Sequence, residues 1–167
     1  MMKLLITIEV IAVGPLELII KPIPPGFQSW RSQHFTEQQL SNPTISGHFA
    51  DPDLGTVANV FEFFYNSDPM TAESNIRPFL GQTTLNGERY VTFTWRENPQ
   101  SGITFIPQFT ESLYDWNFNY DTSGQVWTVE LSDSPTVEPD GTVIKAVRAA
   151  QPISSSSAAF MRLVVQW

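Results

Sequence analysis

The spacing of hydrophobic residues changes along the chain from a helical to an alternating pattern near Glu88. Before this point, apolar residues at helical spacing predict an amphipathic segment over 27–40, as one short helix or two, and a helix over 57–65. The residues expected to face the core from the second segment are Val57, Val60, Phe61 and Phe64. Residues 70–87 show neither period and are expected to be irregular.

Beyond Glu88, apolar and polar residues alternate, as is typical of strands with one buried face. Turn residues separate the alternating runs. The expected strands are 88–96, 103–109, 126–131, 143–147 and 160–167, and the turns lie at Gly102, 121–124, 133–135 and 140–141. The sequence therefore predicts a mainly β fold, an antiparallel β-sandwich or jelly roll with one or two short helices.

The first 26 residues form a separate apolar unit. Residues 3–13 and 15–23 are rich in Ile, Leu and Val around a Gly14-Pro15 break, which predicts a strand pair. Thr7 and Glu9 interrupt the first apolar run, so strands are preferred over a cleaved signal peptide. We expect residues 1–26 to complete the sheet of the 27–167 module or to pair with a neighbouring chain.

Composition narrows the classes of function. The 167 residues carry a formal net charge of −8, only 16% are charged, 13 are proline and none is cysteine. The negative charge argues against nucleic acid as a partner, and the missing cysteines remove thiol chemistry and thiolate metal sites. No apolar run is long enough for a transmembrane helix. Few charges and many turn residues favour a chain that works outside the cell.

An acidic loop precedes the 57–65 helix and carries the clearest candidate chemistry. Oxygen-bearing side chains stand at positions 1, 3, 9 and 12 of a loop that starts at Asp51; they are Asp51, Asp53, Asn59 and Glu62. This spacing is typical of Ca²⁺ loops, but Gly55 and Thr56 depart from the usual residues. In the alternative interpretation, which we prefer, Asp51 and Asp53 cap the helix.

Other candidate sites are weaker. His34 and His48 lack a third ligand at a spacing typical of zinc sites, and no nucleophile is paired with a base, so we do not expect an enzyme. Tyr114 and Tyr120 are candidates for an exposed surface that stacks on sugar rings. The tryptophans of the predicted strands are expected mainly in the core; they are Trp95, Trp116 and Trp127.

Three segments, in order, carry a resemblance to a known family. They are Asp51–Pro69, Phe109–Trp116 and Phe160–Val165. Over residues 27–167 the chain resembles the C-terminal module of large secreted proteins of Verrucomicrobia and Planctomycetes, with a DPDGDGxxNxxEY-like segment, an S-x-x-L-x-x-W-like strand and a closing F-x-R-L-like strand. Leu54, Gly55 and Thr56 stand where that segment has Gly-Asp-Gly. The resemblance implies a secreted β-rich spacer, adhesion or attachment module without enzymatic activity.

These observations together predict a non-catalytic structural or adhesion module, extracellular or at the cell surface. Its expected partners are further copies of itself, joined through the N-terminal strands into a filament, or components of the cell surface and extracellular matrix. The alternatives are a carbohydrate-binding module that uses exposed aromatic residues and a surface module stabilised by Ca²⁺. No other cofactor is expected.

Overall fold

The structure is a computed structural model that describes residues 23–24, 26–73, 77–111, 115–117, 119, 124–155 and 160–166. The predicted N-terminal strands at 3–13 and 15–23 fall almost wholly outside the described residues. Tyr114 and Tyr120 also lie outside them.

Four short α-helices and two 3₁₀-helices are present among the described residues. The α-helices are α1 (Phe27–His34), α2 (Glu37–Leu40), α3 (Pro43–Ser46) and α4 (Asn59–Tyr65), and the 3₁₀-helices are η1 (Pro99–Ser101) and η2 (Ile153–Ser155). Both predicted helical segments are confirmed, with 27–40 divided into α1 and α2. The α3 helix is an addition: Pro43 occupies its first turn, and the Asn42 side chain accepts a hydrogen bond from the Thr44 N–H at 3.1 Å.

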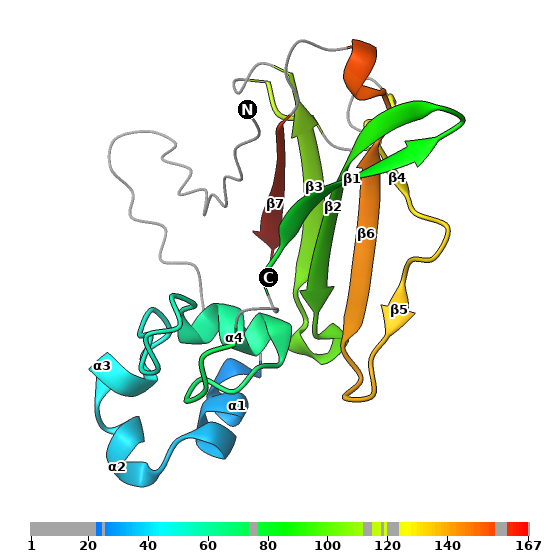
Figure 1. The fold of residues 1–167 in the computed structure, drawn as a ribbon. Coiled ribbons are helices and arrows are strands. Elements are labelled where there is room, and N and C mark those ends of the chain that lie inside the picture. The colour runs from blue at the N-terminus through cyan, green and yellow to red at the C-terminus, as the bar shows by residue number, and fades with distance from the viewer. Residues whose placement is uncertain are drawn as a thin grey trace, which may run out of the picture.

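The strands form two antiparallel sheets. They are β1 (Phe79–Leu85), β2 (Glu88–Glu97), β3 (Thr104–Thr110), β4 (Thr128–Glu130), β5 (Thr136–Val137), β6 (Val143–Ala149) and β7 (Phe160–Gln166). The five-stranded sheet has the order β1-β2-β6, with β4 and β5 both pairing with β6, and β3 pairs with β7 in the second sheet. The predicted mainly β, sandwich-like class is confirmed (Figure 1).

The β1 strand corrects the expectation that residues 70–87 are irregular. It pairs with β2 without interruption from Phe79↔Thr94 to Leu85↔Glu88. Its hydrophobic pattern is weak because β1 is the outermost strand, where four of its seven residues are exposed. Apolar and polar residues alternate along a strand when one of its faces is buried. Because β1 has little buried surface on either face, its sequence shows no clear alternation.

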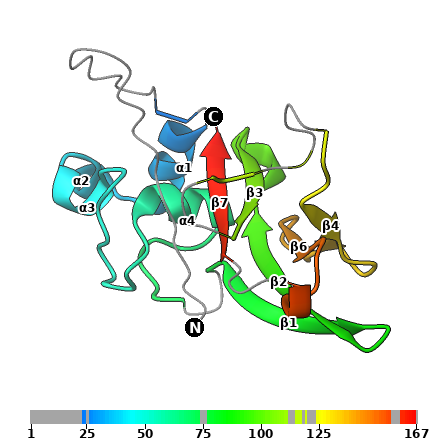
Figure 2. The same ribbon diagram turned by 90° about the horizontal axis from the view of Figure 1, so that it is seen from above.

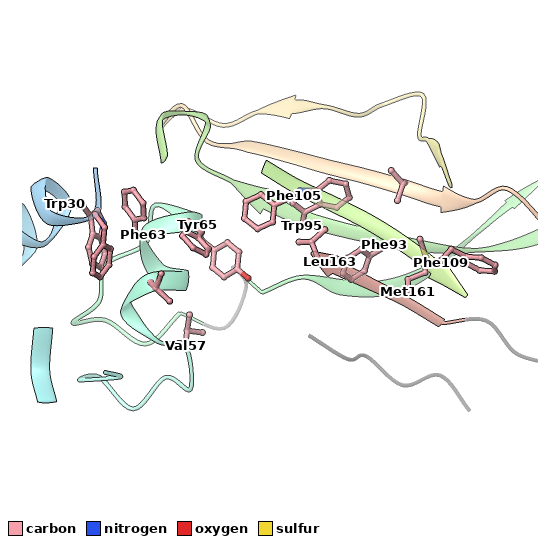
Figure 3. Packing of buried hydrophobic residues seen from close by; sticks show 14 of the residues in the cluster. Trp30, Val57, Phe63, Tyr65, Phe93, Trp95, Phe105, Phe109, Met161 and Leu163 are labelled. Atoms are coloured by element: carbon pink, nitrogen blue, oxygen red, sulfur yellow. The ribbon is translucent and has the colours of Figure 1, made fainter. Parts of the chain in front are cut away.

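The helices lie at one end of the sheets, while the hairpin of β1 and β2 extends away from them (Figures 1 and 2). One hydrophobic cluster joins the two parts. Figure 3 shows it running from Trp30 and Phe63 through Phe105 and Trp95 to Phe109. At the junction, the rings of Phe64 in α4 and Phe105 in β3 meet edge to face, with centroids 6.1 Å apart. The Phe64 carbonyl also accepts a hydrogen bond from the Asn98 N–H at 2.8 Å.

The α4 helix contributes more to this cluster than its spacing predicted. Val57, Val60 and Phe64 are buried as expected, and Phe61 is half-buried against the cluster. Phe63 and Tyr65 are buried as well. Because α4 is covered on several sides, its apolar residues extend around most of its circumference.

The segment that follows β3 contacts β7 beside the second sheet. The Arg162 guanidinium of β7 lies 4.4 Å from the centre of the Trp116 ring, and its Nε donates to Gln108 Oε1 at 2.7 Å. Arg162 is buried. The stacked ring and the hydrogen bond stabilise the buried charge and connect β7 to β3 and to Trp116.

None of the helices in the described part of the chain has the length and apolar character needed to cross a membrane.

Candidate functional site

The start of α4 is held by main-chain carbonyls of the segment before the acidic loop. The Asn59 N–H donates to the Ala50 carbonyl at 2.8 Å, and the Val60 N–H donates to the His48 carbonyl at 2.9 Å. Ala58 occupies the N-cap position, and no side chain caps this helix. The expectation that Asp51 and Asp53 cap the helix is therefore wrong, because backbone groups already take the open N–H positions.

Asp51 and Asp53 instead shape the loop itself. Asp51 Oδ2 accepts from the Thr56 N–H at 2.9 Å, and Asp53 Oδ1 accepts from the Gly55 N–H at 2.7 Å. The second oxygen of each carboxylate, Asp51 Oδ1 and Asp53 Oδ2, is buried without a hydrogen-bond partner in the described structure. Each aspartate thus holds the loop backbone through one carboxylate oxygen, and its other oxygen can still accept a hydrogen bond or bind a cation.

The Asn59 side chain connects α4 to the end of α3 through its amide nitrogen, while its amide oxygen accepts no hydrogen bond from the described residues. Its side chain is fully buried, and Nδ2 donates to the carbonyls of Ile45 and Gly47, each at 2.8 Å. Asn59 Oδ1 is buried and has no donor in the described part of the chain. A buried acceptor without a partner costs about 1–3 kcal/mol, so a third oxygen in this loop has an unmet interaction.

Glu62 is the fourth residue of the predicted set, and it is only 1% exposed. Its carboxylate accepts a hydrogen bond from the Ser67 hydroxyl. Burial raises the pKa of Glu62 from 4.5 to about 7; the Ser67 hydrogen bond opposes this rise, and the negative charges of Asp53, Glu73 and Asp51 add to it. Burial also raises the pKa of Asp53; the hydrogen bond from the Gly55 N–H opposes this rise, and the neighbouring Asp51 carboxylate adds to it. The loop is therefore short of positive charge.

The backbone of the loop retains a conformation suited to glycine. Leu54 has φ 59° and Thr56 has φ 66°, both in the left-handed region. These are the two positions at which the resembling segment has Gly. A β-branched residue such as Thr56 is rare in this region. At Gly55 an added Cβ would lie 2.9 Å from Asp53 Oδ1, so a side chain there would displace that carboxylate.

Arg77 closes the loop from outside. Its guanidinium donates to the Gly55 carbonyl and to the Thr56 hydroxyl. This contact ties the loop to the segment that leads into β1. Both of these hydrogen bonds go to the main chain and the threonine, and neither goes to an aspartate.

The acidic side chains do not by themselves complete a metal site. Across the described residues, no three His, Cys, Asp or Glu side chains come together closely enough to hold an ion. A cation in the loop would need Asn59 Oδ1 and main-chain carbonyls in addition to the aspartates. Oxygen donors of these kinds are the ligands that Ca²⁺ takes.

The two histidines make separate aromatic contacts. The His34 ring lies 4.8 Å from the Trp30 ring, and burial lowers its pKa while the charge of Asp68 opposes this change. His48 packs 4.5 Å from the Phe49 ring beside an open hollow of about 380 Å³. His48 is the one ionisable side chain among the residues that line this hollow, which are Pro43, Thr44, Gly47, His48, Phe49 and Ala50.

The described tryptophans belong to the interior or to stacked contacts. Trp95 is buried, as predicted. Trp116 lies beneath Arg162, and the half-buried Trp127 stacks on Phe109 with centroids 6.4 Å apart. A sugar-binding surface stays a prediction that rests on Tyr114 and Tyr120.

Comparisons of this chain with protein families, with curated proteins and with solved structures found no match. The loop therefore has to be interpreted from its own geometry. That the four residues form one ion site stays a prediction from their spacing. Sequence spacing missed Ser67 as the partner of Glu62, and the signal for that contact was the Asn66-Ser67 turn that ends α4.

Proposed function

We propose that this chain is a non-catalytic structural or adhesion module of the cell exterior whose acidic loop binds a Ca²⁺ ion. The observation that carries the proposal is a set of buried side-chain oxygens at the first, third and ninth positions of the loop that have no donor among the described residues: Asp51 Oδ1, Asp53 Oδ2 and Asn59 Oδ1.

A hard cation is the natural partner for such oxygens. Ca²⁺ takes six to eight oxygen ligands and tolerates irregular geometry, which suits aspartate, amide and main-chain donors from one loop. Glycine at position 5 removes a carboxylate ligand, and Glu62 is engaged by Ser67. Few charged ligands favour an affinity of about 10⁻⁴–10⁻³ M, the range of extracellular modules.

The ion would stabilise the helical part of the module. The loop leads directly into α4, and α4 packs on the sheets through Phe64 and Phe105. Fixing the loop therefore fixes the orientation of α4 at the end of the sheets. This role needs no reacting group, in keeping with a spacer or attachment unit. The resemblance to secreted modules and the low share of charged residues support the exterior location.

Calcium-dependent stability tests the proposal. We expect the melting temperature of the full chain to rise by several degrees between excess chelator and 10 mM CaCl₂, because a ligand that binds only the folded state stabilises it. Asp53→Asn should remove most of this rise. Asp133→Asn, at an exposed turn of the five-stranded sheet, is the matched control and should keep it.

Isothermal titration with CaCl₂ separates binding from a general salt effect. One bound ion per chain, lost in Asp53→Asn and kept in Asp133→Asn, would support the proposal. Equal melting temperatures in chelator and in Ca²⁺, with no binding heat, would overturn it. MgCl₂ serves as a further control, because Mg²⁺ demands a stricter octahedral geometry.

A further inference from the structure

The two long edges of the five-stranded sheet differ in how they are protected. On one side, the edge is divided between β4 and β5, with three and two residues. Asp133 and Pro135 lie between them, and Glu130 ends β4. Short strands, charges and proline are the usual means by which natural sheets prevent pairing with another chain.

The strand at the other edge has none of these features, although Arg77 and Pro78 directly precede it. β1 is seven residues long, and its register with β2 contains no bulge. Its sequence, Phe-Leu-Gly-Gln-Thr-Thr-Leu, has no charged residue and no proline. Among the described residues β1 pairs only with β2. Within the described part of the sheet, β1 is therefore the edge that lacks protection against pairing.

The hairpin turn indicates which backbone groups this edge presents. Asn86 and Gly87 both have positive φ, at 51° and 83°, as in the two-residue turn that suits a hairpin. Such a turn closes on a hydrogen-bonded pair, here Leu85 and Glu88. Alternation along the strand then directs the N–H and C=O groups of Leu80, Gln82 and Thr84 away from β2.

The hairpin is braced on its β2 side. The Ser154 hydroxyl of η2 donates to Glu88 Oε2 at 2.8 Å, and the Arg148 guanidinium of β6 lies 4.6 Å from the centre of the Tyr90 ring. Both contacts restrain β2, and β1 is paired with β2 along its whole length. Because the β1 edge is already ordered, adding a strand to it has a lower entropic cost.

The strand is complementary to itself. When two copies of β1 pair antiparallel about Gln82, Phe79 of one copy stands opposite Leu85 of the other, and the pair repeats at the other end. Phe79 is 56% exposed and Leu85 is 41% exposed, both large for apolar side chains. Directly opposed aromatic and aliphatic side chains stabilise an antiparallel pair, and two Gln82 side chains meet at the centre.

We propose that a second copy of this chain pairs with it through β1, antiparallel and about a two-fold axis at Gln82, to join two five-stranded sheets. The geometry favours β1 over the two long strands of the second sheet, because β3 contains Pro107 and is bridged to Asn117 at Phe109, and Met161, Arg162 and Leu163 of β7 are buried. The inference is independent of calcium binding, since its residues lie outside the loop of Asp51 to Glu62.

The association constant of the full chain tests this inference. Sedimentation equilibrium over a range of concentrations should show a monomer–dimer equilibrium. Gln82→Lys should weaken dimerisation at least tenfold, because it places two like charges opposite each other on the pairing edge. Val137→Lys is the matched control: Val137 is 70% exposed on β5, at the opposite edge, and the change should leave dimerisation within twofold.

Crosslinking locates the interface. The chain has no cysteine, so Gln82→Cys introduces a single thiol. Opposed residues of an antiparallel pair lie within the Cα separation that a disulfide allows, and we expect mild oxidation to give a covalent dimer. Val137→Cys should not crosslink. A monomer at all concentrations would overturn the inference, as would a dimer that Gln82→Lys does not weaken. The latter would be expected if residues 3–23 form the contact.

Discussion

Glu62 shows what sequence spacing can and cannot predict for a single residue. Its position in the loop and on the helix was predicted, and the loop aspartates were identified with it. Its almost complete burial was not. A carboxylate is rarely buried, so its place in the sequence argues for exposure. Only the packed structure shows that Ser67 and the turn after α4 cover it.

The raised pKa of Glu62 gives a prediction for the metal-free protein. Because the pKa is 4.5 before burial and about 7 in the fold, the folded state holds more protons between these pH values. The stabilisation is full below pH 4.5 and is lost as the pH rises through 7, by on the order of 3 kcal/mol.

Urea unfolding in chelator at about pH 5 and about pH 8 measures this effect. The natural chain should lose stability between the two values, and Glu62→Gln should lose much less. Glu130→Gln, at an exposed position of β4, should behave like the natural chain. If Glu62→Gln keeps the full loss of stability, another group is responsible.

At the level of elements, strands with one buried face were predicted well and β1 was not. β2 has Val91, Phe93 and Trp95 on its buried face, and these alternate with polar residues. β1 has one half-buried apolar residue toward the core, Leu80, and its remaining apolar residues are exposed. Pairing with β2, and not burial, makes this segment a strand, so its pattern carries little information.

The acidic loop gives a prediction at the same scale, because its backbone is in the left-handed region at Leu54, where residues with a side chain are strained. Leu54 has φ 59° and is 82% exposed, so Leu54→Gly removes strain and loses little buried surface. We expect the free energy of unfolding to increase by about 0.5–1 kcal/mol, the cost of the left-handed conformation less the entropy that glycine adds to the unfolded chain.

Val126→Gly provides the comparison for this change. Val126 is also exposed, and its φ is not in the left-handed region. Glycine there should destabilise the chain, because it adds freedom to the unfolded state and relieves no strain. Urea unfolding in chelator measures both variants. A loss of stability in Leu54→Gly would show that the loop carries no strain at this position.

At the level of the whole molecule, the helices and sheets share one hydrophobic cluster, and Phe64 lies at their junction. Phe64 is 1% exposed. Phe64→Ala should lower the free energy of unfolding by about 3–5 kcal/mol and lower the urea midpoint of the helices and sheets together. Half-buried Phe61 is the matched control, and Phe61→Ala should cost less.

Circular dichroism and tryptophan fluorescence follow this transition with different weights, since Trp30 reports on the helices and Trp95 on the five-stranded sheet. Coincident curves in the natural chain would indicate one cooperative unit. A loss below about 1 kcal/mol in Phe64→Ala would contradict the role of this junction.

The pairing of the sheets has a consequence for the time course of synthesis. Among the described strands, β2 pairs on its inner side with β6, and β3 pairs with β7. Both partner strands are synthesised much later than β2 and β3. Phe105, whose ring packs on Phe64 of α4, is likewise synthesised after that helix. Contacts between distant parts of a chain form slowly. The growing chain therefore leaves α4 uncovered until β3 is made and leaves strand edges unpaired until β6 and β7 emerge, so its native fold can form only after that point.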